Sequence, residues 1–325
     1  MKFLERALDN QSQAWKYIIT LIVSFLGGSI IGSIPLIAVM VYAAIKNGTV
    51  PNTENIYDFA SYGLSQNSFF FLMILPFVFS LAILLFLNKV LHKRSYTEII
   101  NGRKNVRWKR FISGAIFWLI LSGVSLSAGY ALDPSNFVFQ FELSSFLPLL
   151  VITLVMIPLQ TSYEEMAFRG YMAQGVAAVT RNRWWVLIIP SVTFGLLHSF
   201  NPEVAEHGFW IMMPQYILFG LIFGIISILD DGIELAMGVH AANNVFAALF
   251  VTNSSSVFQT PAVFNMLVVD PKWGIVELLV LGGIMFAFFY KKYNWSFSVM
   301  NRPVEKETTI TEDTITDQQE PEQYD

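Results

Sequence analysis

A few polar side chains capable of acid–base chemistry lie in stretches that are otherwise apolar. They are Glu164, His198 and His240, with Asn244 one helical turn after His240. Ionisable groups are costly in hydrocarbon, so they face the interior of a helix bundle or a water-filled cavity. A carboxylate and a histidine brought together there would form a proton-handling pair. We therefore predict one buried polar site built from distant parts of the chain.

Helical spacing separates the roles of two adjacent glutamates. Glu165 and Arg169 are four residues apart with the acid first, which is the favourable order for an ion pair along a helix. Glu164 points about 100° away around the helix and lacks that partner. We predict that Glu165 and Arg169 form a structural pair and that Glu164 is the working carboxylate. Two alternatives stay open: the charges lie in water beyond the end of the span, or both glutamates only neutralise Arg169.

The depth of the first histidine matches that of the glutamate. Glu164 lies 18 residues before Asn182, in a tight turn, and His198 lies 16 residues after it. At a rise of about 1.5 Å per residue, both are about 25 Å from the turn. We therefore expect them at similar depth on adjacent antiparallel helices, with Phe194, four residues before His198, stacked beside its ring.

The second histidine shares a helix face with an amide. His240 and Asn244 are four residues apart, and His240 is nine residues past Asp231 in the preceding turn. That spacing puts His240 about 14 Å from this turn. It therefore meets Glu164 only if the turn near residue 182 extends roughly 10 Å further into the cytoplasm than the turn near Asp231.

Apolar stretches long enough to cross a membrane alternate with short polar segments. Of the 325 residues, 54% are hydrophobic and 14% are charged, and cysteine is absent. The absence of cysteine excludes disulfides, thiolate metal sites and a cysteine nucleophile. Crossing about 30 Å of hydrocarbon takes about 20 apolar residues. We predict an all-α, polytopic membrane protein with about eight transmembrane helices, over residues 15–45, 69–90, 111–132, 147–178, 184–200, 209–229, 233–252 and 273–290.

The basic residues gather on one side of the membrane if both termini are cytoplasmic. In that orientation, only Lys46 and Lys272 of the 20 Lys and Arg residues lie outside. Cytoplasmic segments carry such an excess of positive charge, so we predict a multi-pass protein of the cell membrane with both termini cytoplasmic. The net charge of −4 and the lack of a basic stripe predict no nucleic-acid partner.

Three short motifs carry the polar residues, in order and on separate predicted spans. EEMAFR at 164–169, FGLLH at 194–198 and HAANN at 240–244 match the patterns EExxxR, FxxxH and HxxxN. The sequence thus resembles the CPBP family of intramembrane proteases, which includes type II CAAX-processing enzymes and bacteriocin-processing or self-immunity (Abi) proteins. We divide the chain into N-terminal transmembrane helices (1–146), a CPBP-like catalytic core (147–252), a last transmembrane helix (253–300) and a disordered acidic tail (301–325).

The resemblance implies hydrolysis of a peptide bond in a membrane-associated peptide or protein, with a CAAX-type protein as one such substrate. It implies that Glu164 activates a water as general base, assisted by His198. The oxyanion of the tetrahedral intermediate would be stabilised by His240 and Asn244. The supporting residues around this site would be Glu165, Arg169 and Phe194.

The cofactor and the function class stay open at this point. Glu164, His198 and His240 could hold zinc with an open water position, because two histidines and a glutamate are an established catalytic set. The chain has no HExxH motif and four polar groups suffice without a metal, which favours a site that requires none. The alternatives are a non-enzymatic membrane immunity or scaffold protein and a proton- or cation-coupled transporter, although no inverted repeat is evident.

Overall fold

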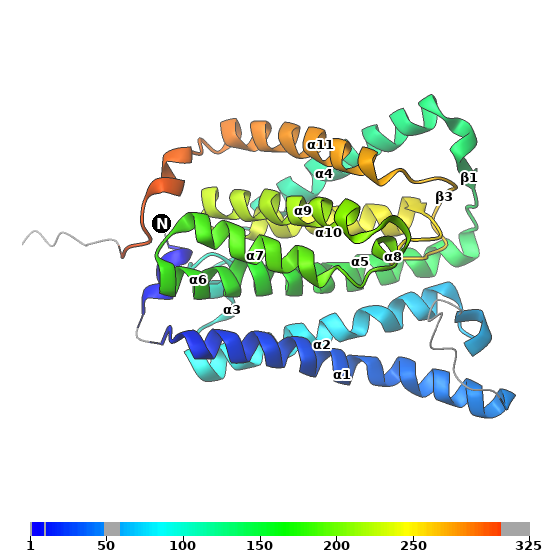
Figure 1. Cartoon of the computed structure of the whole chain (residues 1–325), viewed down its shortest axis with the longest axis horizontal. Helices are drawn as coiled ribbons and strands as arrows, with labels where there is room; N and C mark the ends of the chain where they lie inside the picture. The colour runs from blue at the N-terminus through cyan, green and yellow to red at the C-terminus, as the bar shows by residue number, and fades with distance from the viewer. Residues whose placement is uncertain (1, 10, 49–58, 307–325) are drawn as a thin grey trace, which may run out of the picture.

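The chain folds into a bundle of long helices that run roughly along one direction (Figure 1). The computed structural model describes residues 2–9, 11–48 and 59–306. Its long helices are α1 (Ala14–Asn47), α2 (Gln66–His92), α4 (Trp108–Leu132), α5 (Leu143–Glu165), α7 (Arg183–Leu197), α9 (Phe209–Leu229), α10 (Glu234–Phe250) and α11 (Pro271–Lys292). The shorter helical elements are η1 (Leu4–Leu8), η2 (Phe59–Tyr62), α3 (Tyr96–Ile100), η3 (Pro134–Asn136), η4 (Met166–Met172), α6 (Ala173–Thr180), α8 (Pro202–His207) and η5 (Phe297–Asn301).

The all-α, polytopic membrane fold is confirmed, but the count of eight spans is not. Six helical segments of the described chain are long and apolar enough to cross a membrane: α1, α2, α4, the continuous α5–η4–α6, α9 and α11. The predicted spans 184–200 and 233–252 correspond to α7 and α10, which have 15 and 17 residues. They are shorter than predicted because α7 ends at Leu197 and α10 runs only from Glu234 to Phe250.

The predicted span 147–178 is one continuous helix that changes from α-helical to π-helical and back to α-helical. α5 ends at Glu165, the π-helical segment η4 follows directly, and α6 then completes the helix to Thr180. A π-helical segment widens the helix and is frequently found at functional sites. In this chain it begins immediately after the two adjacent glutamates.

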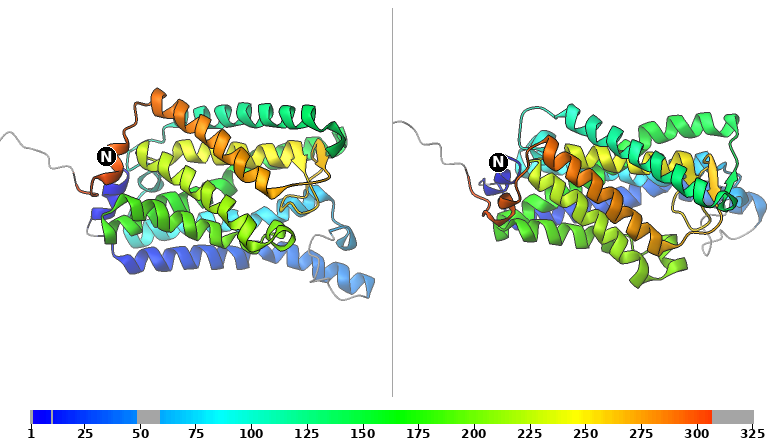
Figure 2. Two further views of the ribbon diagram at one scale, coloured as in Figure 1. Left: turned by 45° about the horizontal axis from the view of Figure 1, so that its top comes forward. Right: turned by 90° about the horizontal axis from the view of Figure 1, so that it is seen from above.

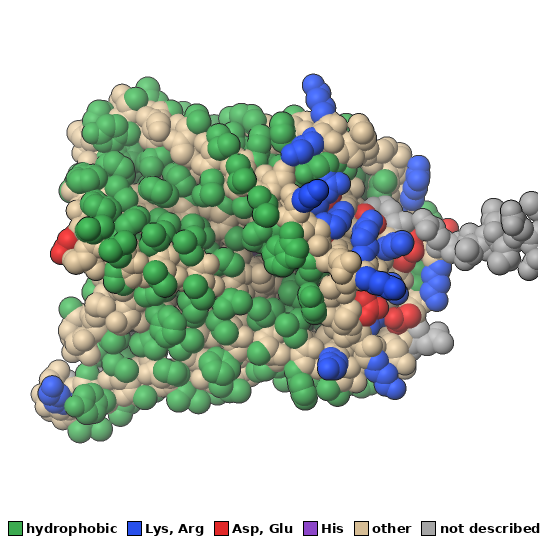
Figure 3. Space-filling view, turned by 180° about the vertical axis from the view of Figure 1, so that it is seen from behind, with side chains coloured by type: hydrophobic (Ala, Val, Ile, Leu, Met, Phe, Trp, Pro, Cys, Tyr) green, Lys and Arg blue, Asp and Glu red, His purple; other side chains and the backbone are tan. Residues whose placement is uncertain are grey.

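Small residues let neighbouring helices approach closely, as is common in membrane bundles. A Cβ added at Gly238 of α10 would lie 2.0 Å from the carbonyl oxygen of Phe111 in α4. A Cβ added at Gly28 of α1 would lie 2.0 Å from Oγ of Ser80 in α2. The outer faces carry many exposed apolar side chains (Figure 3), as expected for a surface that contacts lipid.

The two ends of the bundle differ in structure. One end, here the sheet end, carries a small three-stranded sheet in the order β1 (Phe137–Phe139), β3 (Phe264–Met266) and β2 (Val251–Thr252) (Figure 1). β3 is antiparallel to β1 and parallel to β2. Figure 2 shows α11 running obliquely over the bundle between the two ends.

The opposite end, here the terminal end, holds the first and last described residues. The prediction of a disordered tail from residue 301 is wrong for its first residues, because Val304 is fully buried and its backbone N–H donates to the carbonyl oxygen of Arg181 over 2.8 Å. Its remaining part, 307–325, lies outside the described residues.

Candidate active site

The imidazole of His240 lies between the two adjacent glutamates. Its Nδ1 is 2.8 Å from Oε1 of Glu165, and its Nε2 is 3.4 Å from Oε2 of Glu164. All three side chains are buried. Since an ionised carboxylate only accepts hydrogen bonds, Nδ1 carries a proton and Nε2 faces Glu164. Glu164 and His240 therefore form a close pair of an acid and an imidazole.

The predicted pair of Glu165 and Arg169 is present. Nη1 of Arg169 lies 2.9 Å from the same Oε1 that accepts from His240. The guanidinium also lies over two aromatic faces, 4.1 Å from the ring centre of Phe194 and 5.4 Å from that of Phe223. These contacts hold the side chain of Glu165 in place, whereas its neighbour Glu164 lines the cavity.

Gln160, one turn before Glu164, joins the glutamate to the last motif. Its Nε2 donates to Oε2 of Glu164 over 2.8 Å, and its Oε1 accepts from Nδ2 of Asn244 over 3.1 Å. Nδ2 of Asn244 also lies 3.5 Å from Nε2 of His240. Asn244 thus reaches the glutamate through Gln160, which the sequence motifs did not include. The spacing of four residues between Gln160 and Glu164 is the signal that would have found it.

His198 is held by its backbone and by aromatic rings. Its Nδ1 lies 2.7 Å from the carbonyl oxygen of Phe194, so Nδ1 donates and Nε2 is left with a free lone pair. The ring of Phe194 lies beside it, with centroids 4.5 Å apart, and Tyr216 of α9 stacks on it at 4.6 Å. Phe194 therefore has the predicted position, whereas Tyr216 was not predicted.

The site opens into one large cavity of about 1110 Å³. Five predicted residues and Gln160 line it: Gln160, Glu164, Phe194, His198, His240 and Asn244. The three motifs therefore meet at one water-accessible space, although Glu165 and Arg169 are not among its lining residues. A buried carboxylate, two imidazoles and an amide around such a space can move protons and stabilise negative charge.

The geometry does not match the zinc alternative. Within the described residues, no group of three or more His, Asp or Glu side chains is arranged to hold a metal ion. In particular, His198 does not join Glu164 and His240 in a three-ligand set.

Comparisons with known proteins agree with the motifs. Residues 142–246 match the family described as type II CAAX prenyl endopeptidase Rce1-like. The chain is also 28% identical over 295 residues to the uncharacterised protein YyaK of Bacillus subtilis strain 168, covering 88% of this chain and 95% of that protein. No solved structure matches it. The resemblance to type II CAAX-processing proteases is therefore confirmed over residues 142–246, which carry all three motifs.

Proposed function

We propose that the protein is an intramembrane endopeptidase that uses Glu164 to activate water. The observation that carries this proposal is the contact of His240 with both adjacent glutamates beside a large cavity that Glu164 and His240 line. A family of peptidases matches the same stretch of chain. The proposed catalytic core is the predicted region 147–252.

The chemistry follows from the positions of the donors and acceptors. Glu164 takes a proton from a water whose oxygen attacks the carbonyl carbon of the scissile bond, and returns that proton to the leaving amide nitrogen. His198 assists by accepting a hydrogen bond from that water through its free Nε2. Nε2 of His240, which is protonated before the attack, and Nδ2 of Asn244 donate to the oxyanion, so the proton of the water stays on Glu164 until it passes to the leaving nitrogen. Glu165 and Arg169 orient His240 throughout.

We also propose that the protein lies in the cell membrane with both termini cytoplasmic. Lys and Arg side chains cluster at the terminal end of the molecule (Figure 3), and the positive-inside rule places such an end in the cytoplasm. The site then lies between the membrane surfaces, and its substrate is a membrane-associated peptide or protein.

The proposal is tested by cleavage with purified protein in liposomes. A mixed peptide library is incubated with the protein, and new N-termini are identified by mass spectrometry. We expect Glu164→Gln to lower the cleavage rate by about 10²–10⁴-fold, the usual contribution of a general base, and His198→Ala to lower it as well. The matched control Glu305→Gln, at an exposed position of the terminal end, should cleave like wild type. Cleavage that survives in Glu164→Gln would refute the proposed role of this residue.

Chelation separates the two cofactor alternatives. Because no three-ligand group is arranged for a metal within the described residues, we expect treatment with EDTA or 1,10-phenanthroline to leave the cleavage rate unchanged. A loss of cleavage that added zinc restores would overturn the metal-free site. A folded protein that cleaves no peptide in any form would instead favour an immunity or scaffold function.

A further inference from the structure

The cavity that holds the site extends toward the sheet end. Its lining includes residue 133 and residues 135–137, together with residues of α8 and of the loop before it. Parts of the segments 251–258 and 266–274 also line it. All of these segments lie at or near the sheet end. Within the described chain, no lining residue comes from segments 2–9, 89–110, 180–184, 229–233 or 291–306 of the terminal end. The cavity therefore connects Glu164 with one end of the bundle and not with the other.

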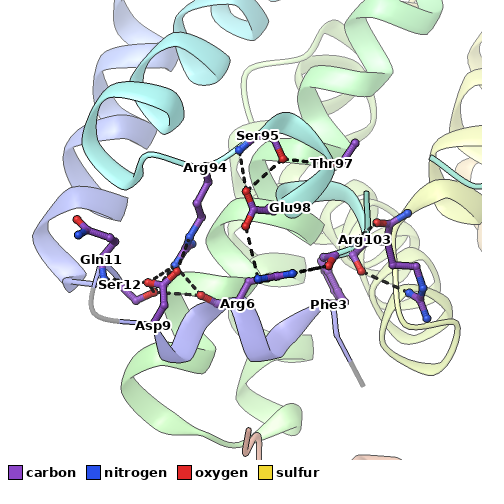
Figure 4. A network of polar contacts seen from close by, with 12 residues as sticks. Phe3, Arg6, Asp9, Gln11, Ser12, Arg94, Ser95, Thr97, Glu98 and Arg103 are labelled. Atoms are coloured by element: carbon purple, nitrogen blue, oxygen red, sulfur yellow. Dashed lines mark hydrogen bonds and ion pairs between the residues drawn. The ribbon is translucent and has the colours of Figure 1, made fainter. Parts of the chain in front are cut away.

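The N-terminal segment closes the terminal end. Phe3 and Leu4 are buried, and the backbone N–H of Phe3 donates to Oδ1 of Asp231 over 3.0 Å. Arg94 forms an ion pair with Asp9 at 2.7 Å (Figure 4). Phe3 and Leu4 pack into the same hydrophobic core as the middle of the bundle. This segment thus fills the space that an opening on this side would need.

The C-terminal segment covers the same end from the other side. Nη1 of Arg183 donates to the carbonyl oxygen of Pro303 over 2.7 Å, and Nε1 of Trp295 donates to Oδ1 of Asp230 over 3.1 Å. These contacts tie the segment after α11 to the turn between α6 and α7 and to the turn between α9 and α10. Both ends of the described chain therefore seal the terminal end.

Apart from histidine, the charged side chains that line the cavity are all acidic. Its charged residues, apart from histidine, are Asp133, Glu164, Glu203, Asp270 and Glu277, and no Lys or Arg of the described chain lines it. Burial raises the pKa of Glu203. Asp133, Asp270 and Glu277 are exposed and have no ion-pair partner among the described residues. A cleft lined by one sign of charge attracts ligands of the opposite sign.

These features disfavour a cytoplasmic CAAX protein as the substrate. A CAAX sequence ends in a free carboxylate three residues after its cysteine. That carboxylate would have to enter a cavity that offers acidic side chains and no cation. It would also have to reach the site through the sealed terminal end.

We propose, given the peptidase function above, that the substrate is an exported polypeptide whose basic segment enters the cavity from the extracytoplasmic side. The mouth at the sheet end lies outside the membrane when the basic terminal end is cytoplasmic. The acidic residues of the mouth then select Lys and Arg near the scissile bond. The substrate class is thus a cationic, membrane-associated peptide or pro-segment on the outer side.

The side of access is measured without any cleavage assay, because the chain contains no cysteine. Single substitutions Ser135→Cys and Ser256→Cys place a thiol in the cavity lining at the sheet end. The matched control Lys104→Cys is exposed in the basic loop of the terminal end. Each variant is expressed in an intact bacterial host and treated with a membrane-impermeant maleimide.

We expect Ser135→Cys and Ser256→Cys to be labelled in intact cells and Lys104→Cys only after the membrane is permeabilised. The reverse pattern would overturn the proposal while leaving the peptidase function standing. Conversely, labelling as expected with no cleavage by the wild type would refute the peptidase and keep the direction of access.

Substrate charge is tested with the liposome assay and a pair of synthetic peptides that differ only in having lysine or glutamine beside the cleaved bond. We expect the lysine peptide to be cleaved faster, and Glu277→Gln to reduce that preference by about threefold to fivefold, as for the loss of one exposed charge pair. The control Glu142→Gln is exposed near the same end but outside the cavity lining and should keep the preference. Equal cleavage of both peptides by the wild type would exclude a cationic substrate.

Discussion

Individual side chains in the site work as a connected network. Gln160 uses both ends of its amide, donating to Glu164 and accepting from Asn244. The amide thereby fixes which carboxylate oxygen faces His240, since that same Oε2 is the atom nearest to Nε2. A residue outside the family motifs therefore controls the orientation of the proposed base.

Removing this amide should slow the reaction without unfolding the protein. We expect Gln160→Ala to lower kcat by about 10- to 100-fold, because a hydrogen bond to a charged group is worth about 1.5–3 kcal/mol. The rate is measured in the liposome assay, with Gln140→Ala, at an exposed position outside the cavity lining, as the control. An unchanged kcat would show that Glu164 does not depend on Gln160.

The pair of Glu165 and Arg169 should matter for stability as well as for activity. Both side chains are buried, and removing one partner of a buried pair leaves an uncompensated charge that costs about 3–5 kcal/mol. We expect Arg169→Met to lower the Tm in detergent far more than Arg181→Met, which changes the exposed arginine that directly follows α6. Equal Tm values for the two variants would mean that the charge of Glu165 is neutralised by another group.

Sequence reasoning found the charged residues better than the contacts between them. The pairing of Glu165 with Arg169 follows from helical spacing alone. The bond from His240 to Glu165 joins two distant helices, and its geometry depends on how α5 and α10 pack, which spacing within one helix cannot give. Tyr216 was missed because aromatic residues are common in every span, so its stacking on His198 has no sequence signal.

At the scale of helices, close packing brings the motifs together. Gly238 lies two residues before His240 and lets α10 touch the backbone of α4. Any side chain at that position would push α10 away from α4. The glycine therefore sets the position of His240 without taking part in the chemistry.

A methyl group at this contact should be strongly destabilising. We expect Gly238→Ala to lower stability by about 1–3 kcal/mol or more, since a Cβ 2.0 Å from a backbone oxygen forces the helices apart. Gly123→Ala on α4 is the matched control, because a Cβ there meets no atom within 4 Å. The two variants are compared by thermal unfolding in detergent and by labelling of a reporter cysteine in the cavity. Similar Tm values would contradict the close contact.

The depth predicted for His240 requires the turn after α6 to extend beyond the turn before α10, and the structure meets this condition. A Cβ added at Gly170 would lie 3.5 Å from Cδ1 of Ile233, in the turn before α10. Gly170 precedes the end of α6 at Thr180 by ten residues, or about 15 Å of helix. The turn after α6 thus extends beyond the turn before α10, as His240 requires. The π-helical segment η4 was not predicted, because its sequence has no pattern that separates it from an α-helix.

For the whole molecule, the sealed terminal end holds several buried charges. Asp230, at the end of α9, forms ion pairs with Arg107 at 3.0 Å and Arg110 at 3.4 Å, and Glu234 shares Arg107. Burial raises the pKa of Asp230 to about 6 from its usual 3.8, even though Arg107 and Arg110 act to lower it. This carboxyl is therefore a titrating group within the seal.

The sign of the resulting pH dependence follows from proton binding. Between about pH 4 and about pH 6 the folded protein holds a proton on Asp230 that the unfolded chain has released. The contribution of Asp230 to the free energy of unfolding therefore falls as the pH rises through this range. We expect the Tm of wild type, relative to Asp230→Asn, to decline across this range and to level off above about pH 7. A difference in Tm that stays constant from pH 4 to pH 7 would contradict a raised pKa.

The contact of Phe3 with Asp231 has a consequence for biosynthesis. The two residues are 228 positions apart, so the start of the chain leaves the ribosome long before its docking site exists. The segment around Phe3 stays undocked until α9 has been inserted and the turn after it has formed. The N-terminal segment therefore docks only when the bundle is nearly complete. A truncated product that stops before α10 would leave this segment exposed to cellular proteases.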